Sequence, residues 1–445
     1  MQALRRVALA LCLLAFWAAP AWAGTSSGTV AMDDGVQVAY DLYTPDGPAP
    51  AAGWPAVVVM HGLGGSKDSM AQIAQVFRSG GYAALAFSVR GQGTSTGDFE
   101  LASARDVADM QAMVRWLKAQ PGVGARVGCF GISLGGGECW NATPTGIFDA
   151  VVPVATWTSL GSALWPGNVA RSGIVAGFAQ AVAARSPLIR EQATNAVQSR
   201  DMSAIAALTS ARSVVSRLQG VKTPVYMFQG RVDYAFDVDQ ARLAFTRLAG
   251  PKKLYVGDFG HPPSTFTSPD FPSYVLAQSR AWFDRFLKGT PNGIDRAPAV
   301  VVSDRTGKRR ASFAAWPKTK VVGVGFRGTK DSRLGPRFGQ ALETFGGSVL
   351  RVQVQKLSHY PRLVAVVTAN GKVVTHGAVV PRKGLNTIRL AAYAVYLPKG
   401  TRLAVRFGPD GGRTDLAYLG FGDRGSIRLG AAFLNLQTLT KAVSR

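Results

Sequence analysis

A serine in a tight glycine-rich turn is the first group in the chain whose type and spacing could do chemistry. Residues 131–135 read Gly-Ile-Ser-Leu-Gly. They follow the apolar run 127–130 directly, and Gly136 and Gly137 then open a helical stretch. This order of strand, sharp turn and helix is typical of a nucleophile elbow, where small neighbours let strand and helix pass closely and the serine hydroxyl is exposed. The sequence therefore predicts Ser133 as a nucleophile.

A second match to the same pattern lies in a different setting. With 51 glycines in 445 residues, a pattern as short as Gly-x-Ser-x-Gly also occurs by chance. Ser95, in residues 93–97, comes after a strand end and a turn at residues 90–92, and Asp98 and Glu100 precede any helix. This context is typical of a loop, so we do not expect Ser95 to be catalytic.

A serine hydroxyl becomes a good nucleophile only when a positioned base removes its proton. His261, in the segment Asp-Phe-Gly-His-Pro of residues 258–262, follows the last apolar run of the N-terminal part and so lies at the end of the sheet where the elbow emerges. His61 lies far upstream of the serine, and His359 and His376 lie in the later β-rich part. We predict that His261 is the base, with a structural loop histidine as the alternative.

The imidazole in turn needs an acid that fixes its orientation. Asp233 directly follows an apolar run, whereas Asp237 lies four residues further on and Asp239 two beyond that, on a predicted helix. The chain order serine, aspartate, histidine is the one that hydrolases with this kind of elbow use. The sequence therefore predicts the triad Ser133, Asp233 and His261.

Backbone N–H groups near the serine are predicted to hold the oxyanion that forms on attack. The residue after the nucleophile supplies one donor, the N–H of Leu134. The segment 61–65 (His-Gly-Leu-Gly-Gly), after the run ending at Met60, supplies the other, the N–H of Leu63. His61 is then expected to shape this loop, with a metal or phosphate role as the alternative, although no Lys-Ser/Thr pair follows the glycines. With four histidines in the chain, the sequence predicts no metal and no cofactor.

The elements that must position these residues alternate between short apolar runs and helical stretches up to about residue 289. Continuous apolar strands separated by helices predict a parallel sheet covered on both faces, an α/β fold of the doubly wound kind. The predicted strands are residues 55–60, 83–87, 127–130, 150–155, 225–229 and 253–256, and the predicted helices are residues 70–78, 101–120 and 274–288. Residues 29–45 alternate and turn at Asp33-Asp34-Gly35, which predicts an antiparallel hairpin.

Two further segments complete the predicted domain organisation. Residues 161–218 interrupt the α/β domain (24–290) with an alanine-rich helical stretch much longer than a plain crossover, so we expect a helical cap over the site. Residues 291–445 become β-rich, with Asn370-Gly371 as a hairpin signal, and predict an all-β sandwich or jelly roll. The β-rich runs are residues 300–302, 321–326, 349–354, 363–368, 387–390 and 402–407.

The first 23 residues are predicted to be a signal peptide. Arg5 and Arg6 precede an apolar run at residues 7–17, shorter than the roughly 20 residues of a membrane-spanning helix, and Ala-Trp-Ala at 21–23 forms a cleavage site. We expect a secreted or periplasmic protein, with a permanent N-terminal anchor as the alternative.

After export two cysteines are left in the chain, residues 129 and 139, and they are predicted to be buried thiols rather than a bridge.

The charge is unevenly distributed along the chain. The formal net charge is +24, and residues 291–445 carry 26 Lys and Arg against 7 Asp and Glu. Such a block attracts anionic polymers, so an anionic cell-envelope polymer is a predicted partner of the β domain, with a solvated basic surface as the alternative. No nucleic-acid-binding motif accompanies the charge, so no specific nucleic-acid partner is expected. The sequence does not define an oligomeric state.

The chain resembles the Xaa-Pro dipeptidyl-peptidase and cocaine-esterase (CocE/NonD) family of serine hydrolases. The resemblance rests on the loop 90–97 (RGQGTSTG), the elbow around Ser133, Asp233 and His261, and it extends to residues 282–289 (WFDRFLKG), 316–317 and 369–372 (ANGK). It covers essentially the whole mature chain. It implies a hydrolase core, a helical cap and a jelly-roll C-terminal domain, with the cap and the β domain helping to wall the site. It also implies hydrolysis of esters, or of peptide bonds after an N-terminal X-Pro pair.

The sequence also departs from this family. Family members often place a tyrosine in the oxyanion loop and another after the nucleophile, where this chain has His-Gly-Leu at 61–63 and Leu134. An exopeptidase also needs an acid for the ammonium of its substrate, and Glu138 on the elbow helix is expected to be structural. Trp157 and Trp165 are expected either to pack in the core, which is the favoured interpretation, or to line an apolar acyl pocket.

We therefore predict an exported serine hydrolase that cleaves a carboxylic ester or an acyl or peptide bond through an acyl-enzyme, with a small-molecule ester or a short peptide as substrate. An Xaa-Pro dipeptidyl-peptidase is the alternative within the same mechanism. The alternative from another class is a non-catalytic binding protein that uses the basic β domain on anionic envelope polymers, and the complete serine, aspartate, histidine order argues against it.

Overall fold

The computed structural model describes residues 24–445 except residues 199–201, 329–331, 416, 421–424 and 444–445. The predicted signal peptide, residues 1–23, lies outside the described residues. In the described part of the chain, no helix is both long and apolar enough to cross a membrane.

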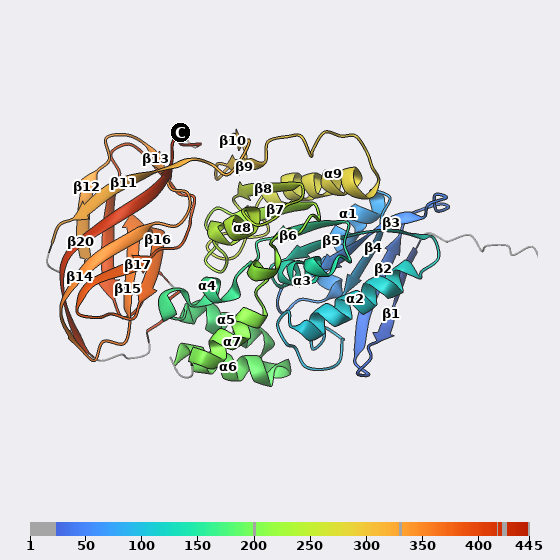
Figure 1. The fold of residues 1–445 in the computed structure, drawn as a ribbon, viewed down its shortest axis with the longest axis horizontal. Coiled ribbons are helices and arrows are strands. Elements are labelled where there is room, and N and C mark those ends of the chain that lie inside the picture. The colour runs from blue at the N-terminus through green and yellow to red at the C-terminus, as the bar shows by residue number, and fades with distance from the viewer. Residues whose placement is uncertain (1–23, 199–201, 329–331, 416, 421–424, 444–445) are drawn as a thin grey trace, which may run out of the picture.

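A mixed ten-stranded sheet runs through the N-terminal part of the molecule (Figure 1). Its strands lie in the order β1-β2-β4-β3-β5-β6-β7-β8-β9-β10. Neighbours from β4 to β9 pair in parallel, and β1, β2 and β10 add antiparallel edges. The strands are β1 (Gly24–Ala31), β2 (Gln37–Thr44), β3 (Trp54–Met60), β4 (Ala83–Phe87), β5 (Val123–Ile132), β6 (Ala150–Val154), β7 (Val225–Gly230), β8 (Lys252–Gly257), β9 (Val300–Ser303) and β10 (Arg310–Phe313). The predicted α/β sheet and its N-terminal hairpin are confirmed.

Helices cover both faces of this sheet. In β3, Val58 packs with side chains of α2 and α3, whereas Val57 and Val59 pack with side chains of α1 and α9. Because both faces are buried, these strands are continuously apolar rather than alternating. The helices are α1 (Ala71–Ser79), α2 (Ala104–Lys118), α3 (Leu134–Ala142), α8 (Val238–Phe245) and α9 (Leu276–Leu287), with short turns η1 (Lys67–Met70), η2 (Thr143–Thr145) and η6 (Phe271–Val275).

Residues 161–218, expected to form a cap, fold as a helical layer between β6 and β7 (green in Figure 1). Because β6 ends where this layer begins, the layer lies at the edge of the sheet where the parallel strands end. It contains α4 (Leu160–Leu164), η3 (Pro166–Asn168), α5 (Ser172–Val182), η4 (Ala183–Arg185), α6 (Pro187–Val197), α7 (Met202–Ala211) and η5 (Val215–Arg217). Its described residues contain no strand.

The C-terminal part is a sandwich of two four-stranded antiparallel sheets with one shared core. The sheets have the orders β11-β20-β14-β17 and β12-β19-β15-β16, and β13 pairs with β18 beside them. Side chains from both sheets meet in the core, for example Leu350 of β14 and Val405 of β19. The strands are β11 (Thr319–Phe326), β12 (Ser332–Arg337), β13 (Leu342–Glu343), β14 (Val349–Ser358), β15 (Leu363–Ala369), β16 (Lys372–Val379), β17 (Gly384–Arg389), β18 (Tyr396–Leu397), β19 (Arg402–Gly408) and β20 (Ser426–Leu439). The predicted hairpin at Asn370 and Gly371 joins β15 to β16, and both turn residues have positive φ.

The first sheet continues beyond residue 290, where the domain boundary was predicted. Residues 300–302 were expected in the β domain, but β9 pairs in parallel with β8, and β10 pairs with β9. A short, fully apolar run fits a buried parallel strand and a sandwich strand equally well, so its composition did not distinguish the two. The sandwich therefore begins with β11, after Phe313.

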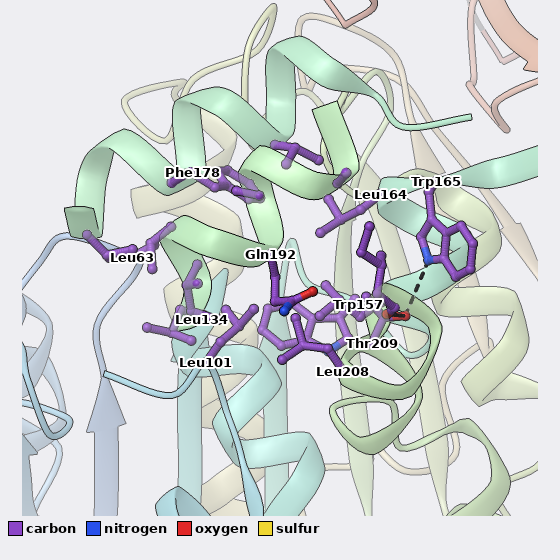
Figure 2. A pocket seen from close by; sticks show the side chains of 18 of the residues that line it. Leu63, Leu101, Leu134, Trp157, Leu164, Trp165, Phe178, Gln192, Leu208 and Thr209 are labelled. Carbon is purple, nitrogen blue, oxygen red and sulfur yellow. Dashed lines mark hydrogen bonds between the residues drawn. The ribbon is translucent and has the colours of Figure 1, made fainter. Parts of the chain in front are cut away.

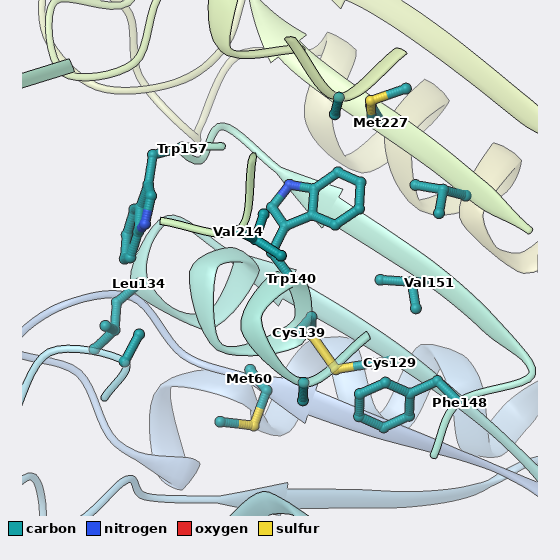
Figure 3. Packing of buried hydrophobic residues seen from close by; sticks show 14 of the residues in the cluster. Met60, Cys129, Leu134, Cys139, Trp140, Phe148, Val151, Trp157, Val214 and Met227 are labelled. Carbon is teal, nitrogen blue, oxygen red and sulfur yellow. A yellow bond between two sulfur atoms is a disulfide. The ribbon is translucent and has the colours of Figure 1, made fainter. Parts of the chain in front are cut away.

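Cys129 and Cys139 form a disulfide, so the prediction of two buried thiols is wrong. Cys129 lies in β5 and Cys139 in α3, on either side of the elbow turn, with Cα atoms 5.9 Å apart. Figure 3 shows the bond inside the apolar core, beside Phe148. The turn folds the helix back against the strand, and this brings two cysteines ten positions apart into bonding range.

Candidate active site

The turn around Ser133 has a backbone conformation that close packing enforces. Ser133 lies between β5 and α3 with φ 54° and ψ −113°, outside the regions that residues with side chains normally occupy. A Cβ atom at residue 135 would lie 2.3 Å from the carbonyl oxygen of Met60, so only glycine fits there. The turn therefore presents the Ser133 hydroxyl at the carboxyl edge of the sheet, as an elbow does.

The structure brings Ser133, His261 and Asp233 together in one hydrogen-bonded chain. Ser133 Oγ lies 2.8 Å from His261 Nε2, and His261 Nδ1 lies 2.8 Å from Asp233 Oδ2. The three residues come from the ends of three strands of the same sheet, β5, β7 and β8. Asp233 is fully buried and Ser133 is 7% exposed, so the chain of hydrogen bonds is shielded from water but open at the hydroxyl.

Asp233 is held from several directions. Its Oδ1 accepts the N–H groups of Ala235 and Phe236, each at 2.9 Å, and its Oδ2 also accepts the backbone N–H of His261 at 3.0 Å. Gly260 has φ +124°, and a Cβ atom there would lie 2.5 Å from Asp233 Oδ2, so glycine is what lets the histidine loop approach the carboxylate. Both the ring and the backbone of His261 are thus fixed to one oxygen.

Aromatic side chains surround the imidazole of His261. The ring centroids of Phe236, Phe266 and Phe178 lie 5.2, 5.5 and 6.1 Å from it, each with the edge-to-face or tilted geometry that aromatic pairs prefer. These phenylalanines come from the Asp233 loop, the segment after His261 and the cap helix α5. The sequence pattern did not reveal them, because no local signal links three distant phenylalanines to one histidine.

The other two acids near Asp233 make different contacts. Asp237 caps α8 by accepting the N–H of Asp239, and its second oxygen accepts the N–H of Ala392 at 3.0 Å. Burial raises the pKa of Asp237 to about 6. Asp239 pairs with Arg242. Among the described acids, Asp233 is therefore the one bonded to the histidine.

The predicted oxyanion loop lies against the elbow. A Cβ atom at Gly62 would be 3.8 Å from Ser133 Cβ, and the side chains of Leu63 and Leu134 line the same cavity as Ser133. The N–H of Gly64 donates to Gln92 Oε1 at 2.9 Å, so the loop is held by a residue 28 positions away. The sequence motif around residues 90–97 contained Gln92 but gave no indication of this contact.

His61 has a structural position in this loop. It is fully buried, its Nδ1 lies 2.8 Å from Gly62 O, and its Nε2 accepts the N–H of Val89 at 3.1 Å. Burial lowers the pKa of His61 to about 4, so it is neutral at pH 7 with the proton on Nδ1. The ring therefore ties the start of the loop to the chain after β4. In the described chain, no group of three or more His, Cys, Asp or Glu side chains is arranged to hold a metal ion.

Ser95, the serine of the second Gly-x-Ser-x-Gly match, is buried, and its hydroxyl links two segments of the chain by hydrogen bonds. Its hydroxyl donates to Ser88 O at 2.7 Å and accepts the N–H of Ala39 at 2.9 Å.

Glu138 is also buried, in a small separate cavity that Asp106 and Asp109 line, and burial raises its pKa well above the ordinary value.

An apolar pocket opens at Ser133 and extends into the cap. Trp157 and Trp165 both line it. Trp157 also packs in the hydrophobic core, which was the favoured interpretation. Figure 2 shows Leu63 and Leu134 at one end of the cavity, Trp165 hydrogen-bonded to Thr209 at the other, and Gln192 between them. An apolar lining with a few polar groups is typical of a site that binds the apolar part of a small ligand.

The β domain supports the loop that carries Asp233. Arg231 forms a fully buried ion pair with Glu343 of β13, and its carbonyl accepts the N–H of Ala394 at 2.8 Å. Tyr234 stacks on Tyr393, with ring centroids 5.7 Å apart. The residues on both sides of Asp233 are thus anchored in the second domain.

Known proteins resemble this chain in sequence and in fold. The family model described as X-Pro dipeptidyl-peptidase (S15 family) matches residues 34–263, more than half of the chain. The cocaine esterase of Rhodococcus sp. (strain MB1 Bresler) is 24% identical over 331 residues, which are 62% of this chain and 57% of that protein. The match thus spans little more than half the length of that curated relative.

Solved structures show the same fold across nearly the whole chain. A CocE/NonD family hydrolase from Staphylococcus aureus superposes with a TM-score of 0.69 at 14% identity, covering 94% of this chain and 92% of that one. An α-amino acid ester hydrolase gives 0.67 at 12%, covering 94% of each chain. An aminopeptidase from a marine sediment archaeon, Thaumarchaeota archaeon, gives 0.67 at 13%, covering 94% and 95%. The chain therefore belongs to the X-Pro dipeptidyl-peptidase (S15) family, and it has the fold of the CocE/NonD family hydrolase.

Proposed function

We propose that the protein is an exported serine hydrolase that cleaves carboxylic esters through a covalent acyl-enzyme. The observation that carries this proposal is the continuous hydrogen-bonded chain from Ser133 Oγ through His261 to Asp233, with 2.8 Å at each step. A serine, a base and an acid in this arrangement are the groups that acyl transfer requires.

In the acylation step, Ser133 Oγ attacks the ester carbonyl carbon while His261 Nε2 takes the hydroxyl proton. Asp233 keeps the other ring proton on Nδ1 and stabilises the imidazolium that forms. When the tetrahedral intermediate collapses, the C–O bond to the leaving alcohol breaks, and His261 returns the proton to that alcohol.

In the deacylation step, water attacks the carbonyl carbon of the acyl-serine with His261 again as the base, and the C–O bond to Ser133 Oγ then breaks. The acid product leaves, and the proton returns to Ser133. In both steps the N–H groups of Leu134 and Leu63 hold the oxyanion. Leu134 opens α3, where the first N–H groups have no partner within the helix, and the Leu63 loop lies against the elbow.

Export is supported by two independent features. The first 23 residues have the composition of a cleavable signal peptide. The disulfide between Cys129 and Cys139 is of the kind that persists in oxidising compartments and is rare in the cytosol.

The direct test is Ser133→Ala in the purified mature protein. We expect the kcat for short p-nitrophenyl esters to fall by about 10⁵–10⁶-fold and a fluorophosphonate label to be lost from the serine. The control is Ser79→Ala, an exposed serine at the end of α1, which should keep full activity. Turnover that survives in the Ser133 variant would refute the proposal.

An Xaa-Pro dipeptidyl-peptidase is the second candidate, and the family model favours it. The two activities share the triad and differ in the substrate. Comparing p-nitrophenyl butyrate with Gly-Pro-p-nitroanilide separates them: we expect the ester to be cleaved and the anilide to be left intact. Cleavage of the anilide with a kcat/KM equal to or above that of the ester would instead assign the peptidase activity.

A further inference from the structure

The described side chains that line the cavity at Ser133 offer a substrate no charged partner. Among its described lining residues none carries a charge, and most are aliphatic or aromatic. Glu138, the acid on helix α3, lines a separate small cavity with Asp106 and Asp109. An ammonium placed in such a pocket would lose its hydration without gaining an ion pair, at a large cost in free energy.

One polar side chain in this cavity has an unused hydrogen-bonding atom. Gln192 of α6 lines the cavity, and its Oε1 is buried with no hydrogen-bond partner in the described part of the molecule. Thr209 is already satisfied, because its hydroxyl donates to Ile205 O and accepts the Trp165 indole N–H. A buried carbonyl oxygen without a donor is costly, so a bound ligand that supplies the donor is favoured.

The position of Gln192 fixes where that donor must lie. Figure 2 shows its amide between Leu63 and Leu134, on one side, and Trp165 and Thr209, on the other. Ser133 lines the same pocket, and Leu134 is the residue after it. A donor that meets Gln192 is therefore part-way along an acyl chain whose carbonyl is at Ser133, and it is separated from that carbonyl by apolar atoms.

We infer that this cavity binds the acyl part of an uncharged ester, an apolar chain that carries one neutral hydrogen-bond donor such as an amide N–H or a hydroxyl, and that Gln192 accepts the hydrogen bond from this donor. The inference rests on the proposed function, because it assigns the acyl site of the same nucleophile. It excludes acyl groups with a free amine, which aminopeptidases and dipeptidyl-peptidases require.

Two matched pairs of p-nitrophenyl esters test the inference on the mature protein. The 6-aminohexanoate and the heptanoate differ in a terminal charge, and we expect kcat/KM to favour the heptanoate by at least about 100-fold. The N-acetyl-6-aminohexanoate and the nonanoate have equal chain lengths and differ in the amide. Gln192→Met should lower the kcat/KM ratio of this second pair by about 3–10-fold.

Gln192→Glu provides a gain-of-function test. A carboxylate at this position can pair with the ammonium of the 6-aminohexanoate, so kcat/KM for this ester relative to the heptanoate should rise by at least about 10-fold. The matched controls are Gln198→Met and Gln198→Glu, an exposed glutamine that follows α6, and they should leave both ratios at the wild-type values.

The outcomes separate this inference from the proposed function. Equal hydrolysis of the amine ester and the heptanoate by the wild type, or unchanged ratios in both Gln192 variants, would overturn the inference while labelling of Ser133 by a fluorophosphonate upholds the hydrolase. Absence of labelling together with absence of ester turnover would overturn the proposed function and the inference with it.

Discussion

A single carboxylate oxygen fixes both the ring and the backbone of the predicted base. Asp233 Oδ2 accepts from His261 Nδ1 and from the His261 N–H, and Gly260 leaves room for this approach. The orientation of the imidazole therefore depends on one side chain.

Asp233→Asn tests this dependence. An amide can donate to Nδ1, which would hold the ring in the tautomer that cannot accept the serine proton. We expect kcat for p-nitrophenyl butyrate to fall by about 10³–10⁴-fold while the protein stays folded. Stopped-flow or steady-state assays give the rate, and circular dichroism checks the fold. A loss below tenfold would show that Asp233 does not set the tautomer.

Among the single residues of the site, the sequence could predict those whose chemistry requires a fixed local pattern. Ser133 was predicted from the elbow motif, and Asp233 and His261 were predicted from their positions after strands and their order in the chain. Gln192 was not predicted, because it lies in a helix of the cap, α6, where nothing local shows which face meets the cavity. That face is set only when the cap packs on the core.

At the level of elements, the disulfide joins the strand and the helix that form the elbow. It closes a loop of about ten residues around Ser133. Restricting so short a loop in the unfolded chain is worth about 2–3 kcal/mol. We expect the double substitution Cys129→Ala and Cys139→Ala to lower the free energy of unfolding by this amount in urea. An equal urea midpoint for the variant and the wild type would contradict this expectation.

Asp106 in helix α2 makes the free energy of unfolding depend on pH. Asp106 accepts the N–H of Ser103 with one oxygen, while its other oxygen is buried without a partner. Burial raises the pKa of Asp106 to about 6, above the value near 4 of an unfolded chain. The fold therefore holds this proton more tightly than the unfolded chain does, and stability is lost as pH rises from about 4 to about 6.

Asp106→Asn should remove this pH-dependent loss. Between pH 4 and pH 7, the free energy of unfolding of the variant should gain about 2–3 kcal/mol relative to the wild type. Urea titrations at the two pH values measure the gain. The exposed Asp98→Asn is the control and should show no such change. A variant that loses stability in parallel with the wild type would show that other groups cause the pH dependence.

The strands and helices of the α/β domain could be predicted because buried parallel strands are continuously apolar and the helices between them are periodic. Two element-level predictions failed for the same physical reason. The pairing of β9 with β8 and the meeting of Cys129 with Cys139 are tertiary contacts, and neither leaves a local sequence pattern.

At the scale of the whole molecule, the β domain is structurally joined to the catalytic core. The buried pair of Arg231 and Glu343 links the loop of Asp233 to β13. Removing one member of a buried pair leaves a charge without its partner, so Glu343→Gln should lower the free energy of unfolding by about 3–5 kcal/mol and reduce kcat. Asp46→Asn, in an exposed pair with Arg78, is the control and should cost less than about 1 kcal/mol. Equal urea midpoints for the two variants would contradict this role.

Because the cap is a single insertion in the chain, the cap residues that line the acyl site are separate in sequence from the residues that react. Trp165, Gln192 and Thr209 lie in one insertion, residues 161–218, whereas Ser133, Asp233 and His261 lie in turns and loops that follow strands of the surrounding sheet. Replacing that single insertion exchanges much of the wall that selects the acyl group and leaves the reacting atoms in place. Chimeras made at the two junctions, after β6 and before β7, therefore offer a direct route to new substrates from an unchanged mechanism.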